Sequence, residues 1–268
     1  MQNEDVQVGL TAEQRRQYEA NGFLALEAYL DAETVAEMAR AADDLLTSIG
    51  PIVPENPRIQ ADPIGNGYGI RQLWPVVDIS PTFARLATDE RILALFRSLF
   101  DGDTPVLFED KLNYKQPGGG TRFPMHQDYS YWQPYSPRLT SAMIYIDEAT
   151  EANGCLEVVP GWHKRGLLER SEMHITEQVT DHYIPGSVLD PGQAVKVSGP
   201  PGTVILFSCF TPHASAPNLS ARPRRAFILS YNPARDGNAY AETSGANAAR
   251  ARAWLVAQRS RTTGASAP

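Results

Sequence analysis

VLFEDKLNYK (106–115) is the first of six short segments that decide the fold expected for this chain. None of the six has helical periodicity; each is apolar or alternating and is bounded by turn residues, as β-strands are. Six strands without helices between them predict a sandwich or barrel, so we expect an antiparallel β-roll over residues 105–235. The other segments are LTSAMIYI (139–146), CLEVV (155–159), QAVKVS (193–198), TVILFSCF (203–210) and RAFILSYN (225–232).

The first hundred residues have the pattern of helices instead. Thr11 and Gln14 form the sequence signature of a capping box, which predicts a helix over 11–20. Asp31 can cap a second helix, because apolar residues recur at helical spacing after it. Thr88 starts a third helical pattern. The apolar residues of the second helix are Val35, Met38, Ala42, Leu45 and Ile49.

The remaining segments complete a single domain that we expect to span residues 1–268. We expect a strand at 23–30 and a long loop at 51–70, where Pro, Gly and Asn are frequent. Residues 1–104 then form a mostly helical layer that backs the β-roll. Residues 236–268 are rich in Ala and Arg, which predicts a C-terminal helix with a frayed end.

Composition and charge exclude several classes of function. The 268 residues are 42% apolar, and 24 Lys and Arg against 31 Asp and Glu give a net charge of −7. Without a basic tract, we expect no nucleic-acid partner. No stretch approaches the roughly 20 apolar residues of a membrane span, and the acidic N-terminus MQNEDVQ does not resemble a signal peptide. Cys155 and Cys209 lie in apolar stretches, so we expect free, buried thiols and a reducing, cytoplasmic location.

His126 and Asp128, in FPMHQDYSYW (123–132), are the first candidates for a catalytic site. In a strand, residues i and i+2 project from the same face, so this imidazole and carboxylate could share one metal ion. The triplet is common by chance, however, and a surface hydrogen bond is the simpler explanation of it on its own. A further ligand from another strand is needed to favour a metal site.

His213 supplies that ligand, because it follows an apolar strand segment at a point where the strand end could open onto a cavity. Two His and one carboxylate form the facial triad that holds Fe(II) and leaves three positions open, whereas zinc usually takes a fourth ligand. Arg224, eleven residues later, could bind a carboxylate beside the metal through its planar guanidinium. Arg222 and Arg225 make the segment generally basic, so an ordinary surface arginine stays an alternative.

Three segments together resemble the phytanoyl-CoA dioxygenase family of Fe(II)/2-oxoglutarate oxygenases. They are HQD (126–128), NGCLEVVPGWHK (153–164) and HASAPNLSARPR (213–224). The resemblance implies a double-stranded β-helix, the jelly roll of the cupins, which is mainly β with N-terminal helices. It also implies Fe(II), 2-oxoglutarate and O2 as cofactors. The implied reaction hydroxylates an unactivated C–H bond of a small-molecule metabolite, with succinate and CO2 as coproducts.

The resemblance assigns roles to individual residues. It makes His126, Asp128 and His213 the iron ligands and Arg224 the partner of the distal carboxylate of 2-oxoglutarate. Smaller matches with members of the family imply further contacts. Asn113 and Ser215 match positions beside the cosubstrate, and Phe123 and Trp132 match aromatic positions beside the substrate, with core packing as the alternative.

The identity of the substrate is less well determined by the sequence. An aromatic lining suits an apolar or cationic group, whereas Arg71 suits a carboxylate or phosphonate. An amphoteric metabolite with one anionic end, a fatty acyl group and a natural-product intermediate therefore all fit. The loop at 163–192 is long enough to form a lid. The other candidate aromatic residues are Tyr68, Trp74, Tyr129, Tyr131 and Tyr135.

Two other functions stay open at this point. One is a cupin-type metal-dependent dioxygenase or isomerase that does not use 2-oxoglutarate, and the other is a non-catalytic β-roll that binds a ligand. Arg224 favours the 2-oxoglutarate enzyme over both. Asp128 favours hydroxylation or desaturation over halogenation, because related halogenases lack this carboxylate.

Overall fold

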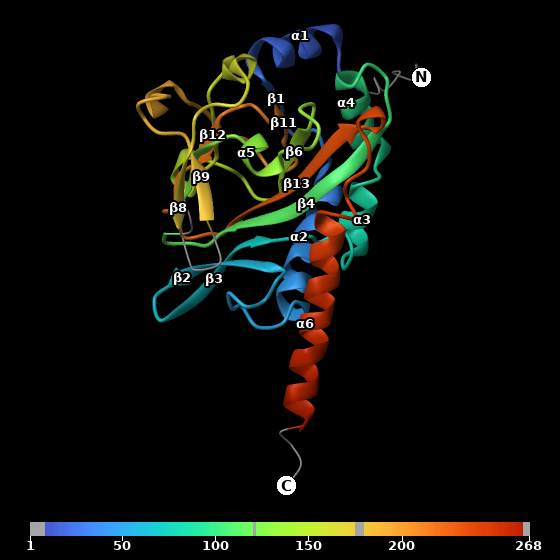
Figure 1. Ribbon diagram of the computed structural model, residues 1–268, viewed down its shortest axis with the longest axis vertical. Coiled ribbons are helices and arrows are strands. Elements are labelled where there is room, and N and C mark those ends of the chain that lie inside the picture. Colours follow the sequence, from blue (N-terminus) through green and yellow to red (C-terminus); the bar gives the residue numbers. More distant parts are fainter. Residues whose placement is uncertain (1–8, 120–121, 175–179, 265–268) are drawn as a thin grey trace.

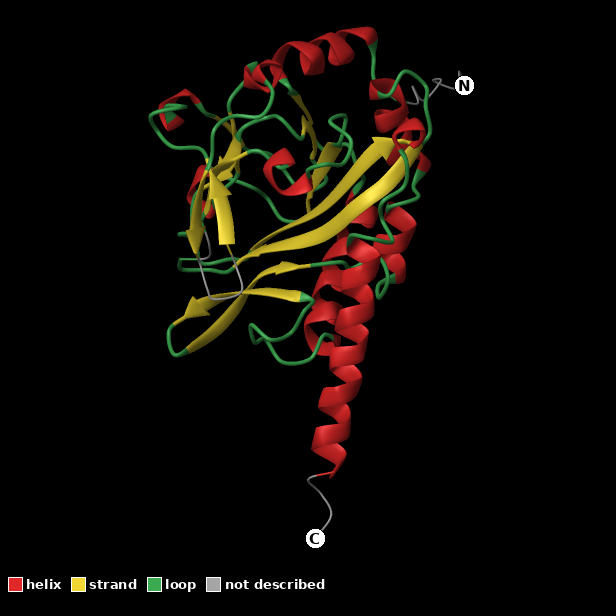
Figure 2. Cartoon of the chain, viewed as in Figure 1, coloured by secondary structure: helices red, strands yellow, loops and turns green. Residues whose placement is uncertain are grey.

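The structure, a computed structural model, describes residues 9–119, 122–174 and 180–264. The acidic N-terminal stretch and most of the GASAP end discussed above lie outside these residues. Within them, helices gather along one side of the strands and α1 lies across the top (Figures 1 and 2). The α-helices are α1 (Ala12–Asn21), α2 (Ala32–Ser48), α3 (Pro81–Leu86), α4 (Glu90–Leu99), α5 (Tyr129–Trp132) and α6 (Ser244–Gly264).

The strands form a seven-stranded sheet, a four-stranded sheet and a separate hairpin, all with antiparallel pairing. In spatial order, the large sheet is β1 (Phe23–Leu26), β11 (Val204–Ser208), β6 (Thr140–Tyr145), β13 (Arg224–Pro233), β4 (Pro105–Lys115), β3 (Gly67–Leu73) and β2 (Ile59–Ile64). The small sheet is β10 (Val195–Val197), β7 (Leu156–Val158), β12 (His213–Ser215) and β5 (Phe123–His126). The hairpin is β8 (Ser171–His174) and β9 (Thr180–Tyr183). The predicted double-stranded β-helix is confirmed.

Strands β11, β6 and β13 of the large sheet are buried on both faces, which explains why they are largely apolar. In β13, Phe227 and Leu229 pack in the core that the helices share, whereas Ala226 and Ile228 pack toward the small sheet. Successive side chains of a strand point to opposite faces, so each strand contributes to both cores. The pairing of β13 with β4 shifts register between Ser230 and Tyr231, which is a β-bulge.

Several expectations about the N-terminal half need correction. The loop expected at 51–70 is wrong from residue 59 onward, because β2 and β3 form a hairpin around Gly65 and Asn66. The Gly- and Asn-rich composition marks the turn of that hairpin, and β3 pairs with β4. The strand expected at 23–30 ends at Leu26, since Ala28 has a φ of 46° that breaks the extended chain.

All four predicted helices are present, as α1, α2, α4 and the C-terminal α6. The capping box of Thr11 is confirmed at α1, and Asp31 caps α2 as expected. The third predicted helix, α4, begins one residue later than expected, because Asp89 and not Thr88 caps it. The short helix α3 was not predicted.

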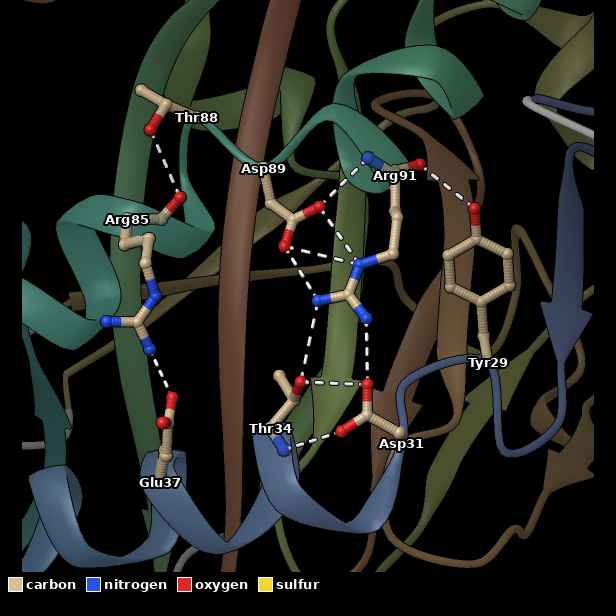
Figure 3. A network of polar contacts seen from close by, with 8 residues as sticks. All are labelled: Tyr29, Asp31, Thr34, Glu37, Arg85, Thr88, Asp89 and Arg91. Carbon is tan, nitrogen blue, oxygen red and sulfur yellow. Dashed lines mark hydrogen bonds and ion pairs between the residues drawn. The ribbon is translucent and has the colours of Figure 1, made fainter. Parts of the chain in front are cut away.

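A network of polar contacts joins the start of α2 to the start of α4 (Figure 3). The Nη1 of Arg91 donates to Asp31 at 2.9 Å, its Nη2 donates to Asp89 at 2.7 Å, and Tyr29 donates to its carbonyl oxygen at 2.9 Å. Hydrogen bonds from the backbone and side chain of Thr34, and then Arg91, lower the pKa of Asp31 to about 2. One arginine thus links the cap residues of two helices that are far apart in sequence.

The C-terminal segment is attached to the chain around Trp74 and to Asp110 of β4. α6 begins beside Trp74, whose Nε1 donates to Ser244 at 3.0 Å, and then runs away from the β-roll (Figure 1). The carboxylate of Asp110 in β4 accepts from the amides of Val76 and Val77, and from the hydroxyl of Tyr240 at 3.0 Å. Among the described residues, no helix has the length and apolarity required to cross a membrane.

Phe227→Ala should lower the free energy of unfolding by about 3–5 kcal/mol. The ring of Phe227 is fully buried and its centroid lies 4.5 Å from that of Phe83, so truncation leaves a cavity between the large sheet and α3. Urea denaturation measures the change. Leu219→Ala is the control, because Leu219 is 76% exposed, and an equal effect of both substitutions would contradict the described packing.

Asp110→Asn should flatten the pH dependence of stability between about pH 4 and pH 6. Burial raises the pKa of Asp110 to about 6, so in this window the folded protein holds a proton that the unfolded chain has released. The free energy of unfolding therefore falls as pH rises, by about 2–3 kcal/mol from this group, and the variant should lose that fall.

Urea denaturation at several pH values measures this slope. Asp103→Asn is the control. Because Arg235 lowers the pKa of Asp103, the effect of this carboxyl group on stability lies at pH values below the window of pH 4 to 6. Identical slopes in wild type and Asp110→Asn would contradict the prediction.

Candidate active site

Three potential metal ligands meet at one end of the small sheet. His126 is the last residue of β5 and His213 is the first residue of β12, and the two are direct partners in the antiparallel pairing. Asp128 follows two residues after His126, where the chain turns into α5. One ligand atom from each of the three lies within 4.8 Å of the others.

The two imidazoles are oriented by backbone carbonyl groups. The Nδ1 of His126 lies 2.7 Å from the carbonyl oxygen of Pro124, and that of His213 lies 2.9 Å from the carbonyl oxygen of Thr211. A carbonyl only accepts, so Nδ1 carries the proton and Nε2 is left with a free lone pair. Each Nε2 lies 3.7 Å from Oδ1 of Asp128, so both lone pairs and the carboxylate converge.

Charge in this site is arranged to suit a cation. Burial alone would raise the pKa of Asp128, but His213, His126 and Lys111 outweigh it and hold the pKa far below the usual range. Burial, and next the neighbouring His126, lower the pKa of His213 to about 4. An ionised carboxylate and a neutral buried imidazole at neutral pH are the protonation states that metal coordination requires.

The geometry differs from the one that the spacing suggested. The i, i+2 spacing predicted His126 and Asp128 on one face of a strand, but β5 ends at His126 and Asp128 has helical dihedral angles. The chain bend, not strand alternation, brings the carboxylate back toward the imidazole. His213 likewise begins β12 in the small sheet, next to β5, and does not end the apolar strand that precedes it.

An inner cavity lies behind the triad and contains Arg224. This side chain is 2% exposed, and its Nη2 donates to the carbonyl oxygen of Gly154 at 2.6 Å. Its Nε and Nη1 have no hydrogen-bond partner among the described residues. A buried guanidinium with two such donors and no carboxylate partner favours an anion, and a carboxylate matches its planar geometry.

Asn113 and Ser215 line the same cavity and are both buried. Oδ1 of Asn113 accepts from Gln72 at 2.7 Å, which holds the amide in place. The structure therefore brings together the three residues that were expected beside a cosubstrate. The cavity is lined by these residues, by the triad and by Gln72, Lys111, Phe123, Met143, Leu156, Phe207, Ala214 and Ile228.

An outer cavity of about 350 Å³ adjoins the inner one, and His126 and Asp128 line both. Of the expected substrate contacts, Phe123, Trp74, Tyr131 and Trp132 line it, and so does Tyr135. The hairpin β8–β9, in the loop that was expected to form a lid, contributes Thr180 and Asp181; residues 175–179 of that loop lie outside the described part of the chain.

Other expected contacts are not brought to this cavity. Arg71 is absent from the described lining of both cavities, because its Nη2 forms a buried ion pair with Asp181 at 2.6 Å. Its guanidinium lies over the ring of Phe123, 4.3 Å from the centroid. Tyr68 is 46% exposed, and Tyr129 packs against Phe210.

The sequence reading missed two charged residues on β4, Glu109 and Lys111, both of which line the outer cavity. They alternate with Asn113 on the inner face of the strand. Polar residues at every second position of an otherwise apolar strand indicate a face that lines a cavity, and this signal was available in VLFEDKLNYK. Because of the β-bulge, Phe108 lines this cavity as well, although it is adjacent to Glu109 in sequence.

A double-stranded β-helix with two His and one Asp around an open position defines a non-haem metal oxygenase. The sequence model of the phytanoyl-CoA dioxygenase (PhyH) family matches residues 18–226, and the chain belongs to this family. The ectoine dioxygenase of Sphingopyxis alaskensis is 31% identical in an alignment 242 positions long, which covers 83% of this chain and 76% of that protein. The family predicted from the motifs is thus confirmed.

Crystal structures of EctD from S. alaskensis are similar in fold. The complex with 2-oxoglutarate and 5-hydroxyectoine has a TM-score of 0.69 and 27% identity, over 88% of this chain and 79% of that one. The form with bound Fe has a TM-score of 0.69 and 28% identity, over 88% of this chain and 80% of that one.

Asp128→Ala should weaken binding of Mn(II), a stable substitute for Fe(II), by roughly 100-fold or more. Loss of a residue that only supports a metal ligand lowers the metal affinity by about 10- to 100-fold, and loss of a ligand itself should lower it at least as much. Calorimetric titration measures the affinity. His174→Ala, which changes an exposed histidine of β8, should leave it unchanged. Equal affinity of Asp128→Ala and wild type would exclude Asp128 as a ligand.

Proposed function

We propose that His126, Asp128 and His213 hold the iron of this enzyme and that Arg224, Asn113 and Ser215 hold 2-oxoglutarate. The chain is an Fe(II)- and 2-oxoglutarate-dependent dioxygenase that acts on a small molecule. When bound, the iron would activate O2, which is the oxidant: one oxygen atom would hydroxylate an unactivated C–H bond of the substrate, and the other would enter succinate as 2-oxoglutarate loses CO2. The observation that carries the proposal is the buried Arg224, with two donors that have no partner among the described residues, behind a convergent triad.

Each group of residues has a separate task. The triad would hold the metal through three ligand atoms, which would leave room for other ligands. Arg224 fixes a carboxylate at the far end of the inner cavity, and Asn113 is held by Gln72 to face the same ligand. The aromatic walls of the outer cavity position the substrate and exclude water from the reaction.

The alternative functions lack this support. An oxygenase or isomerase that does not use 2-oxoglutarate has no need of a buried arginine behind its metal. A non-catalytic ligand-binding roll has no need of an open metal position. The buried donors of Arg224 therefore favour the 2-oxoglutarate enzyme over both.

Two further expectations belong to this proposal. We infer that residues 1–268 act as a single domain, because strands from the N-terminal 104 residues extend both edges of the large sheet. We also infer a cytoplasmic location, since Cys155 and Cys209 are both free and buried.

Arg224→Ala should weaken 2-oxoglutarate binding by about 2–4 kcal/mol, because a buried carboxylate loses its charged partner. Mn(II) affinity should stay near that of wild type. Under anaerobic conditions, the charge-transfer absorption of the Fe(II)–2-oxoglutarate chelate reports the binding.

Arg222→Ala is the matched control, since Arg222 is exposed in the same segment. Absence of the absorption band from wild type at saturating iron and 2-oxoglutarate would overturn the proposed function. An effect of Arg222→Ala as large as that of Arg224→Ala would overturn the assignment of the arginine.

A further inference from the structure

Gln127 is the one residue of the HQD triplet that the proposed function leaves without a role. It lies between His126 and Asp128 in sequence, but it is absent from the described lining of both cavities. It is nevertheless only 2% exposed. Burial of an amide without hydrogen-bond partners costs free energy, so the partners of this side chain indicate what it does.

The amide of Gln127 binds three backbone groups of other segments. Its Nε2 donates to the carbonyl oxygen of Phe210 at 2.6 Å and to that of Gly166 at 2.9 Å. Its Oε1 accepts from the backbone N–H of Leu168 at 2.8 Å. These are three of the four hydrogen bonds that an amide side chain can form. A carbonyl only accepts and a backbone N–H only donates, so the orientation of the amide is fixed at both ends.

The bond to Phe210 joins the two chain segments that carry the proposed ligands. Phe210 lies three residues before His213. The backbone N–H of Tyr129 also donates to the carbonyl oxygen of Cys209, at 3.0 Å. Asp128 therefore lies between two attachments to the same neighbouring segment, one on each side of it in the chain. Together these attachments fix the bend that brings the carboxylate toward the imidazoles.

The bonds to Gly166 and Leu168 attach a further segment, residues 166–168, to the same amide. This segment precedes β8, and the β8–β9 hairpin contributes to the wall of the outer cavity. Leu168 also packs against a buried apolar cluster that contains Met125 of β5. One side chain thus connects the bend at Asp128 with the loop that leads to the outer cavity.

We propose that Gln127 is a positioning residue, whose amide holds Asp128 against the two imidazoles and couples this geometry to the attachment of residues 166–168. The proposal rests on the function proposed above. Metal binding would hold residues 166–168 in place, and release of these residues would weaken metal binding. By thermodynamic linkage, the two effects are equal in size.

The first test compares Gln127→Met with wild type by calorimetric titration of Mn(II) into the full chain. Methionine has nearly the volume of glutamine but cannot form the three hydrogen bonds. Mn(II) affinity should fall by about 10- to 100-fold, which is the usual loss when a residue that supports a metal ligand is changed.

Asn56→Leu is the matched control, because Asn56 is a buried amide with the same kinds of partner. Its Nδ2 donates to the carbonyl oxygens of Ile49 at 2.9 Å and Pro51 at 3.2 Å. Its Oδ1 accepts from the backbone N–H of Arg58 at 3.1 Å. Asn56 is absent from the described lining of both cavities. Both substitutions should lower the midpoint of urea denaturation, but Asn56→Leu should leave Mn(II) affinity unchanged.

The second test is hydrogen exchange of the peptide that contains Leu168, measured with and without saturating Mn(II). In wild type, Mn(II) should slow this exchange by about the factor by which Gln127→Met weakens Mn(II) binding. In Gln127→Met, Mn(II) should not slow it, because the connecting hydrogen bonds are missing. The peptide that contains Asn56 is the internal reference. A purely structural role would lower stability without producing this response to the metal.

The outcomes separate this proposal from the proposed function. A wild-type chain that binds no Mn(II) would overturn the metal centre itself. If wild type binds Mn(II) and Gln127→Met binds it equally well, or Asn56→Leu loses as much affinity, the role of Gln127 is overturned. If Gln127→Met does not fold, exchange in wild type decides. Slower exchange at residues 166–168 with Mn(II) then supports the coupling, and unchanged exchange overturns it.

Discussion

The direct pairing of His126 with His213 is the constraint on which the site depends. Antiparallel partners are fixed in distance by the backbone hydrogen bonds of the sheet, so two of the proposed ligands are positioned before any metal binds. Their ring centroids lie 4.2 Å apart, and backbone carbonyls set both tautomers. Only Asp128 has to be brought in by a bend of the chain, and α5 starts at that bend. The site is thus built mainly from strand register.

Binding a dianionic cosubstrate inside a β-roll requires buried positive charge, which costs stability in its absence. This loss of stability is clearest at Arg224, because burial lowers its pKa and two of its hydrogen-bond donors have no partner among the described residues. Burial, and next Arg224 and Arg71, lower the pKa of Lys115 to about 6. A carboxylate in the inner cavity would relieve this repulsion, so occupancy by ligand should stabilise the fold as well as prepare the reaction.

Patterns in the sequence predict the parts of the molecule in which local and global preferences agree. Sequence motifs identified the strands of the β-roll and the helix caps at Thr11 and Asp31. They also identified the proposed ligands, which are His126, Asp128 and His213. The hairpin of β2 and β3 could not be identified, because its strands contain residues typical of loops and pair with a distant strand. The role of Arg71 was similarly hidden, since its partner Asp181 lies 110 residues away.

The β-bulge opposite Ser230 and Tyr231 has a consequence for how such enzymes diversify. By inserting one residue into the alternation of β4, it allows Phe108 and Glu109 to line the same cavity, while Leu107 packs in the helix-side core. A deletion of one residue there would restore simple alternation and exchange an aromatic wall for an aliphatic one. The proposed metal ligands lie on other elements, so the pocket could change its ligand preference by a shift of register without a change in the triad.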